Sequence, residues 1–531
     1  MPHREPKNRL LFIGLDAADA RLIDEWSRAD YLPSITEMKA RGTWLDLSTT
    51  AEVFHVSAWP SMFTGTTPDK HGLYHAYVTQ PGHQGVLRPR PDETPFPFFW
   101  RLLSDAGKQS IVMDAFLTCP LQPFNGVQIV DWGSWSWFWD PTIIPASVER
   151  QIGAKFGRYP SEDHSKVGMV PVGDFEGFRN RLLAAVATKT RVLKWLMDTQ
   201  EWELCLAVFG ESHPAGHYFW HFQDPAYVTH SPTAAVVLRE TLRDVYAALD
   251  RAIGELLREI DSRTTVIVAS GDGIGPNYSG SHLLTDVLKK IGVFNSADPA
   301  RAQTNEPARD IIGALRNMIP ERLRLAVSTA LLSRHMQEQL SLRWKTAGIA
   351  WARTRAFVIE NANEGYIRIN LSGREPQGCV SPGRDYEELC DDICRTVRTM
   401  INPITDRRAA AAVYKTDDLY SGPRRSHMPD IVIIWDVEAR VTTELLMDKY
   451  GAVRAGAPSC GVAPFYTGNH RPNAFAVAVG PGVPEGRVVE SRSILDLAPT
   501  ILRRFDMAAP AYMDGKPIDE LCSTAASPIR C

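Results

Sequence analysis

The sequence predicts an α/β protein built around a mostly parallel β-sheet. Three apolar runs, residues 10–15, 203–209 and 264–269, lack polar alternation, which is typical of strands buried on both faces of a parallel sheet. Segments with helical periodicity lie between these runs. Polar residues that could bind a ligand follow each run directly, at the end of the strand where α/β proteins bind their ligands.

The N-terminal part combines a buried strand with a candidate anion site. The predicted elements are a strand over 10–15, helices over 20–28 and 33–41, a strand over 43–50 and a helical turn within 55–72. Ser57 opens that turn and Gly65 closes it. A helix start offers unpaired N–H groups and a partial positive charge, so the turn favours binding of a phosphate or another anion. Ser57 is either a simple N-cap or part of that site.

An aromatic stretch interrupts the less regular segment that follows. The predicted elements here are a helix over 95–107, a strand over 110–116 and a helix over 175–199. Residues 132–139 contain four tryptophans and a phenylalanine, with Trp135 near their centre. This stretch indicates either a lid packed on the main body or a stacking wall for a flat substrate group.

A pair of histidines follows the second apolar run. His213 and His217 are four residues apart, so in a helical turn both imidazoles point to one side, as binding of a transition metal requires. After the third run, Asp272 stands among glycines, where it either approaches a ligand closely or belongs to a plain turn. Asn277, at the end of that segment, is a candidate substrate contact.

The remainder of the chain alternates short strands and helices around a further histidine, His470. The predicted elements are a helix over 233–260, a polar helical insertion over 298–345, strands over 356–360 and 365–370, a helix over 386–400, strands over 409–415, 430–435 and 474–479, and a helix over 493–505. His470 immediately precedes the last of these strands.

Six candidate metal ligands stand near the ends of predicted strands. They are Asp16, His55, His213, His217, Asp272 and His470. Because the carboxyl ends of parallel strands share one edge of a sheet, we expect a metal site there. Histidine and aspartate together favour Zn²⁺, with Mn²⁺ or Fe²⁺ as alternatives.

Composition argues against several classes of partner. The chain has 531 residues, 44% hydrophobic residues and a net charge of −4, so a nucleic-acid polymer is not an expected partner. The eight cysteines form no C-x-x-C pair and are expected to be reduced thiols.

Neither a membrane span nor a separate apolar N-terminal segment is recognisable, which favours a cytoplasmic protein. A homo-oligomer is compatible with the sequence.

Several motifs at the two ends of the chain resemble a known superfamily. They are Gly14-Leu-Asp16-Ala, Ala58-Trp-x-Ser-x-x-Thr64-Gly-x-x-Pro68-x-x-His71-Gly72, His217, His470-Arg-Pro, Asp496-Leu-Ala-Pro-Thr500-Ile-Leu and Pro510-x-x-Met513-Asp-Gly515-Lys-Pro. Together they resemble the alkaline phosphatase superfamily, in particular the type I phosphodiesterase/nucleotide pyrophosphatase group and its predicted phosphohydrolase relatives. The resemblance covers about residues 8–75, 200–280 and 465–520.

This resemblance implies a doubly wound α/β domain that carries two metal ions and a Thr or Ser nucleophile. The implied catalytic core is discontinuous and comprises residues 8–75, 200–295 and 465–520. Two insertions are then expected, a cap or substrate segment over 76–199 and a second one, with extra helices and strands, over 296–464.

The expected nucleophile is replaced in this chain. Counting back from Thr64, the position at which the relatives carry it is His55. His55 is accordingly a metal ligand, a nitrogen nucleophile, or a base toward Ser57 or a water molecule. A register shifted by two residues would instead make Ser57 the nucleophile.

The implied metal sites are altered as well. Where the relatives have Asp, a His four residues later and a distant His, this chain has His213, His217 and His470. The Asp-His pair of the second site falls on Gly271-Asp272. A metal ion held by three imidazoles can activate a water molecule near neutral pH. The second site loses a carboxylate, so we expect it to bind its metal weakly or to be empty.

The resulting prediction is a metal-dependent hydrolase of a phosphodiester or phosphomonoester of a small metabolite. Lys70 and Arg471 either neutralise the charge of the substrate or form ordinary salt bridges. Two alternatives remain: a transferase or lyase of altered chemistry from the same superfamily, and a non-catalytic descendant that binds a metal or a metabolite.

Overall fold

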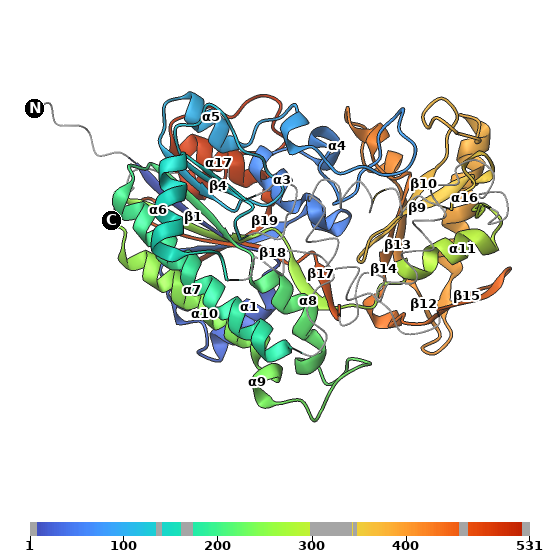
Figure 1. Ribbon diagram of the computed structural model, residues 1–531, viewed down its shortest axis with the longest axis horizontal. Coiled ribbons are helices and arrows are strands. Elements are labelled where there is room, and N and C mark those ends of the chain that lie inside the picture. Colours follow the sequence, from blue (N-terminus) through green and yellow to red (C-terminus); the bar gives the residue numbers. More distant parts are fainter. Residues whose placement is uncertain are drawn as a thin grey trace, which may run out of the picture.

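A nine-stranded sheet dominates the computed structural model, which describes residues 8–133, 141–160, 174–297, 342, 348–455 and 466–522. It occupies the left-hand part of Figure 1. In spatial order its strands are β19 (Arg487–Ser493), β2 (Thr43–Ser48), β18 (Ala474–Val479), β7 (Thr264–Ser270), β1 (Arg9–Leu15), β6 (Leu204–Phe209), β3 (Ser110–Met113), β4 (Gly126–Val130) and β5 (Thr142–Ile144).

The centre of this sheet is parallel. Strands β7, β1, β6, β3 and β4 pair in parallel with their neighbours, and so do β19 and β2. Only β18 and β5 run antiparallel to the strands beside them. The prediction of a mostly parallel sheet is therefore confirmed.

Side chains of β1 point alternately to two apolar layers. Leu11, Ile13 and Leu15 belong to one buried cluster, whereas Leu10 and Phe12 belong to the other. A strand that is buried on both faces needs apolar residues at every position, which explains the unbroken apolar run.

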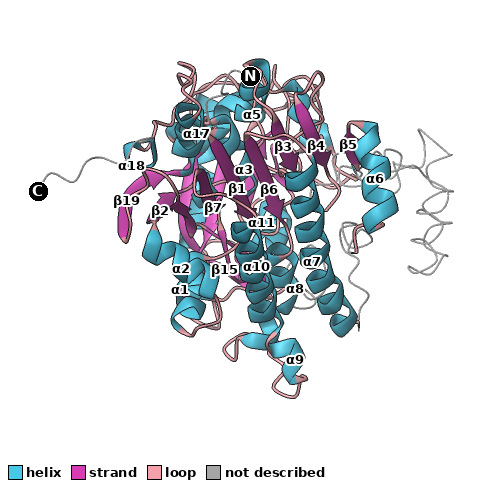
Figure 2. Cartoon of the chain, turned by 90° about the vertical axis from the view of Figure 1, so that its left-hand side faces the viewer, coloured by secondary structure: helices cyan, strands magenta, loops and turns pink. Residues whose placement is uncertain are grey.

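Helices cover both faces of the sheet. The first face carries α1 (Ala20–Arg28), α2 (Pro33–Arg41), α6 (Ala146–Phe156), α7 (Phe175–Thr199), α8 (Ser212–Gln223) and α10 (Thr241–Arg258). The second face carries α3 (Ala58–Thr64), α5 (Phe99–Asp105), α17 (Leu497–Arg504) and α18 (Asp519–Cys522). The short helices α4 (Pro68–His71) and α9 (Val236–Arg239) lie within connections. The doubly wound α/β fold is thus confirmed (Figure 2).

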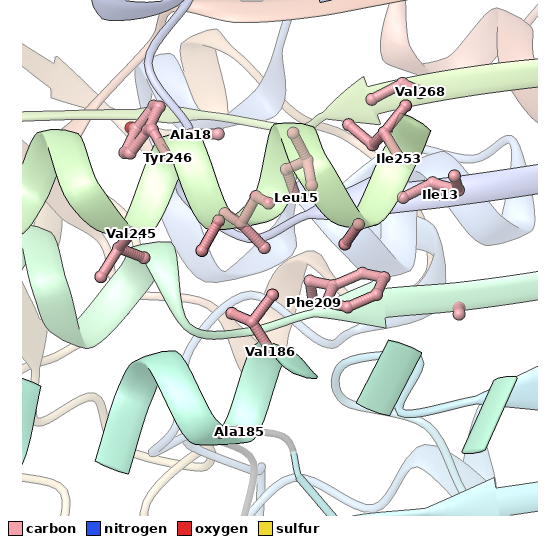
Figure 3. Close-up of a cluster of buried hydrophobic side chains, with 14 of the residues drawn as sticks. Ile13, Leu15, Ala18, Ala185, Val186, Phe209, Val245, Tyr246, Ile253 and Val268 are labelled. Atoms are coloured by element: carbon pink, nitrogen blue, oxygen red, sulfur yellow. The ribbon is translucent and has the colours of Figure 1, made fainter. Parts of the chain in front are cut away.

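The first face is held by aliphatic and aromatic contacts between strands and helices. Phe209 at the end of β6 and Leu15 at the end of β1 lie among Val186 of α7 and Val245 and Ile253 of α10 (Figure 3). These side chains are almost fully buried. Packing at this end of the strands fixes the positions from which the polar residues beyond them project.

A second lobe lies on the right of Figure 1 and contains two small sheets. The first consists of β13 (Ala410–Lys415), β14 (Ile431–Trp435), β10 (Gly365–Ile369) and β9 (Ala356–Ile359), and the second of β12 (Arg407–Arg408), β11 (Ile401–Asn402), β15 (Glu444–Met447) and β16 (Gly451–Arg454). Helices α11 (Leu284–Lys290) and α16 (Arg384–Thr399) share its apolar cluster. This cluster is separate from the two clusters of the large sheet.

The segment 76–199 differs from its prediction as a cap. It contributes β3, β4 and β5 to the large sheet and α7 to its first face. Strand β3 lies within the predicted strand over 110–116, but β4 and β5, only three to five residues long, were too short to be recognised by their periodicity. The predicted helical insertion over 298–345 lies, apart from residue 342, outside the described residues.

The two lobes meet through a small apolar cluster. Phe54 and Tyr74 from the core pack against Ile359, Tyr366 and Val432 of the second lobe. The rings of Phe54 and Tyr366 lie 5.3 Å apart between centroids. This contact brings the start of β10 next to the segment that carries His55.

Two expectations from composition concern membranes and thiols. Within the described ranges, no helix combines the length and the apolar character needed to cross a bilayer. Six of the eight cysteines are described, and all six are free thiols.

Candidate metal centre and active site

Three histidines converge at the carboxyl edge of the large sheet. His213 and His217 lie one turn apart on α8, which follows β6, and His470 lies on the short strand β17 (Gly468–Arg471). One possible ligand atom from each ring lies within 4.8 Å of the others. Both α8 and β17 are on the side of the core that faces the second lobe (Figure 1).

Strand β17 reaches α8 because glycine allows a close approach. β17 pairs antiparallel with β8 (Gly273–Pro276), and His470 lies opposite Ile274. A Cβ atom on Gly468 would overlap the backbone carbonyl of Gly216 in α8, so only glycine fits there. The close approach also lets Nδ1 of His217 donate a hydrogen bond to the carbonyl oxygen of Gly468, at 2.7 Å.

Each of the three rings is held through its Nδ1 atom. Nδ1 of His213 donates to Oδ2 of Asp16 at 2.8 Å, and Nδ1 of His470 lies 2.6 Å from Oδ2 of Asp272. A histidine that donates from Nδ1 to a carboxylate or a carbonyl keeps the lone pair of Nε2 for a metal. This is the outer-shell pattern that orients metal-binding histidines in proteins.

The buried rings favour the neutral form that a metal requires. Burial lowers the pKa of His217 and that of His470 well below the ordinary value, and the neighbouring imidazoles add to this effect. The Tyr466 hydroxyl donates to Nε2 of His217 at 2.6 Å and its ring stacks on the imidazole, so this hydroxyl must turn away for Nε2 to bind a metal. Metal binding therefore does not require deprotonation of His217 or His470 at neutral pH.

Asp16 is fixed from two sides. Its Oδ1 accepts a hydrogen bond from Nε1 of Trp59 at 2.7 Å, while its Oδ2 accepts from His213. Its backbone carbonyl also accepts a bond from the Ser212 hydroxyl at 2.6 Å. Asp16 was predicted as a ligand, and the structure places both of its carboxylate oxygens in hydrogen bonds.

Asp272 has an unused carboxylate oxygen. Its Oδ1 is buried and has no hydrogen-bond partner among the described residues. Burial raises the pKa of Asp272 well above its usual range, and the carboxylates of Asp16 and Glu364 add to this. A cation would relieve both the unpartnered oxygen and the accumulated negative charge. The donor set therefore fits a divalent metal such as Zn²⁺ at the three histidines.

His55 lies beside the three histidines but outside the group with converging ligand atoms. Its ring stacks on that of His470, with 4.3 Å between centroids and 26° between planes. Its Nδ1 lies 2.8 Å from Oε2 of Glu364, a residue of the second lobe. Burial alone would raise the pKa of Glu364, but the interaction with His55 lowers it to about 2, so the carboxylate is the acceptor.

Ser57 is directed elsewhere. Its fully buried hydroxyl donates toward the carbonyl of Phe54 at 2.6 Å and the hydroxyl of Thr50 at 2.7 Å. It occupies the N-cap position of α3 but makes no capping bond with its side chain, which corrects its interpretation as a cap. α3 is also short, and Pro60 in its first turn has no N–H to offer an anion.

The predicted substrate-binding residues have partners within the protein. Lys70 contacts Asp514 at 2.5 Å and the carbonyl of Tyr512 at 3.0 Å. The Asn277 amide donates to the carbonyl of Tyr466, and Arg471 donates to the carbonyls of His470 and Pro276. Trp135 lies outside the described residues. We therefore assign no substrate contact to Lys70, Asn277 or Arg471.

Three residues at the site were not found from the sequence. Trp59 lies four residues after His55, and Tyr466 lies four residues before His470. Their closeness in sequence to a predicted ligand was the only sign that they could belong to the site. Glu364 is more than 300 residues from His55 in sequence, and only the contact between the lobes brings them together. Glu364 and its neighbours Asn361 and Asn363 form a polar loop before a strand. Such loops are common in proteins, so this pattern does not indicate a functional residue.

Comparison with known families decides the class of this protein. The type I phosphodiesterase/nucleotide pyrophosphatase family matches residues 10–458, most of the chain. The chain belongs to this family. The predicted membership of the alkaline phosphatase superfamily is thereby confirmed, and so is the prediction of an enzyme that hydrolyses phosphoric esters. His470 lies just beyond the matched range.

Solved structures with a similar fold include two kinds of hydrolase. Phosphonoacetate hydrolase from Sinorhizobium meliloti 1021, in complex with phosphonoformate, is 12% identical with a TM-score of 0.47, covering 93% of this chain and 94% of that chain. Human ectonucleotide pyrophosphatase/phosphodiesterase 5 is 11% identical with a TM-score of 0.49, covering 96% and 97%. No curated protein sequence matches at a significant level.

Proposed function

We propose that this chain is a metal-dependent phosphoric ester hydrolase that acts on a phosphodiester or phosphomonoester of a small metabolite. One observation carries the metal dependence: His213, His217 and His470 converge within 4.8 Å, and each ring is held through Nδ1. Zn²⁺ fits three imidazoles best, and Mn²⁺ or Fe²⁺ are the alternatives. When bound, such an ion would polarise a phosphoryl oxygen and lower the pKa of water.

Asp16 and Asp272 serve this centre as acceptors behind the ligands. Each holds one ring in place, so that neither His213 nor His470 needs to reorient when the metal binds. The unpartnered Oδ1 of Asp272, behind His470, would supply negative charge to balance a bound cation. This arrangement supports one well-formed metal site rather than two equal ones.

Of the three roles open to His55, we propose that of the base. Its Nδ1 is occupied by Glu364, which leaves Nε2 as the reactive atom. In the proposed step the oxygen of a water molecule bonds to phosphorus, the bond to the ester oxygen breaks, and Nε2 of His55 takes the proton of the water. The departing oxygen is protonated by solvent. Ser57 takes no part in this step, because its hydroxyl donates elsewhere.

The proposed partner is a small-molecule phosphate ester. A net charge of −4 provides no general attraction for a nucleic-acid polymer or an anionic membrane surface. The presence of an imidazole where relatives are expected to carry a hydroxyl favours a second candidate, transfer of a related group such as a sulfuryl or phosphonyl group. Both candidates use the same site.

Metal removal tests the proposal. We expect the protein freed of metal by a chelator to lose hydrolysis of bis(p-nitrophenyl) phosphate and p-nitrophenyl phosphate, and to regain it with Zn²⁺, Mn²⁺ or Fe²⁺. A sulfate ester and a phosphonate monoester in the same assay distinguish the second candidate. Undiminished turnover by metal-free protein would contradict the metal-dependent mechanism.

A further inference from the structure

Glu364 of the second lobe holds His55 at two points. Its Oε2 lies 2.8 Å from Nδ1 of the imidazole, and its Oε1 accepts a hydrogen bond from the backbone N–H of His55 at 3.2 Å. Glu364 is 4% exposed, so both contacts are shielded from water. One carboxylate thus fixes both the backbone and the ring of the same residue.

The carboxylate is itself saturated with donors. Its Oε2 also accepts from the Asn361 amide at 2.7 Å and the Tyr366 hydroxyl at 3.0 Å, and its Oε1 accepts from the Asn363 amide at 3.0 Å. Five donors around two oxygens leave the side chain of Glu364 little freedom to rotate. Its position is therefore set by the second lobe rather than by His55.

The loop that carries Glu364 is anchored to the core near the metal ligands. The Asn469 amide, next to His470, donates to the carbonyl of Ala362 at 2.7 Å. The Ser279 hydroxyl, in the segment that follows Asp272, donates to the carbonyl of Asn363 at 2.8 Å. The same loop thus contacts both chain segments that carry His470 and Asp272.

These contacts determine which nitrogen of His55 carries the proton. A carboxylate can only accept, so Nδ1 donates and the lone pair stays on Nε2. Stacking on His470 at 4.3 Å fixes the plane of the ring next to the three histidines. The two constraints come from different lobes.

We propose that Glu364 is a positioning residue that completes the active site from the second lobe by fixing the tautomer and the ring plane of His55. The kinetic part of this proposal rests on the proposed hydrolysis, whereas the tautomer of His55 is independent of it. In the reaction, Nε2 keeps its lone pair free to accept the proton of the attacking water.

The isosteric amide should reverse this tautomer. In Glu364→Gln, the amide nitrogen cannot occupy the Oε1 position without facing the backbone N–H of His55, which can only donate. It therefore takes the Oε2 position, where the facing side chains can change role: Nδ1 of His55 becomes an acceptor, the Tyr366 hydroxyl donates to the carbonyl of Val53 alone, and the Asn361 amide flips. The proton then moves to Nε2, which can no longer take a proton from water.

Nitrogen NMR of the histidine rings in metal-free protein tests the tautomer directly, with His55→Phe used to assign the signals. We expect Nδ1–H in the wild type, Nε2–H in Glu364→Gln, and Nδ1–H in Tyr366→Phe, which retains the carboxylate. Glu388→Gln, an exposed glutamate of the same lobe, is the matched control. Nε2–H in the wild type, or an unchanged tautomer in Glu364→Gln, would overturn the proposal, even if the protein hydrolyses no phosphate ester.

Kinetics test the consequence for turnover. Replacing the carboxylate that orients a catalytic histidine by its amide lowers kcat by up to about 10⁴-fold through the wrong tautomer. For Glu364→Gln we expect kcat to fall by at least about 100-fold with KM nearly unchanged. The metal content should equal that of the wild type. Loss of metal or a purely KM effect would contradict the positioning role.

Discussion

The indole Nε1 of Trp59 lies 2.7 Å from Oδ1 of Asp16, whose other oxygen holds Nδ1 of His213. Trp59 belongs to α3 on the second face of the sheet, whereas His213 belongs to α8 on the first face. Asp16 stands at the end of β1, between them. A chain of two hydrogen bonds therefore connects the apolar layer around α3 with a proposed metal ligand.

Removing this donor should weaken metal binding. In Trp59→Phe, Oδ1 of Asp16 loses its partner, the carboxylate can rotate, and His213 is less firmly oriented. We expect the dissociation constant for Zn²⁺, measured by competition with a chromogenic chelator, to rise about 10-fold or more. Trp44→Phe is the matched control, because Nε1 of Trp44 bonds to Asp46 within β2 and not to Asp16. An equal effect of both variants would indicate a general loss of packing.

His217 should be essential for metal content. His217→Ala removes one of three converging imidazoles, so we expect the purified protein to lose at least one equivalent of metal. His221→Ala alters a second buried histidine on the same helix, one turn further on, and should retain the metal. Elemental analysis of both variants decides the assignment. Unchanged content in His217→Ala would show that the ligand set is wrong.

His55 and Ser57 should differ in their effect on turnover. His55→Ala removes the proposed base and should be inactive while retaining metal. Ser57→Ala loses buried hydrogen bonds to Phe54 and Thr50, which should cost about 1 kcal/mol of stability while leaving turnover measurable. Steady-state rates and urea unfolding of both variants provide the comparison. A covalent phosphate on Ser57 in acid-quenched enzyme would contradict the proposed role of water.

The buried ion pair between Asp430 and Arg374 in the second lobe should make the free energy of unfolding depend on pH. Burial alone would raise the pKa of Asp430, but the guanidinium groups of Arg374 and Arg368 lower it to about 2. Because the unfolded value is about 3.9, the carboxylate contributes about 2–3 kcal/mol above pH 4. This contribution is lost as the pH falls from about 4 through 2.

Asp430→Asn tests this dependence. At neutral pH we expect a loss of about 3 kcal/mol, because Arg374 loses one of its two carboxylate partners and keeps only Glu375. The difference from the wild type, measured by urea unfolding, should narrow as the pH approaches 2. Asp392→Asn, in an exposed pair with Arg395, should change stability by less than about 1 kcal/mol at any pH. A difference that stays constant with pH would argue against a depressed pKa.

Most elements of the core could be predicted from local patterns. The helix over 175–199 is α7 with the predicted bounds, and the apolar runs 10–15 and 264–269 became β1 and β7 with small differences at their ends. Strand β3 lies within the predicted strand over 110–116, whereas the short strands β4 and β5 were not predicted, since three to five residues are too few for a reliable period. The part of the chain with the weakest periodicity was thus the part assigned incorrectly.

The sequence by itself determined that His213 and His217 face the same way, because a helical repeat places residues four apart on one side. It also determined that Asp16 and Asp272 stand beyond buried strands. Only the tertiary structure decided what these groups contact. Asp16 holds His213, and Glu364 reaches His55 across more than 300 residues. The direction of a polar side chain depends on the partners that folding brings within hydrogen-bond distance, and no local repeat encodes them.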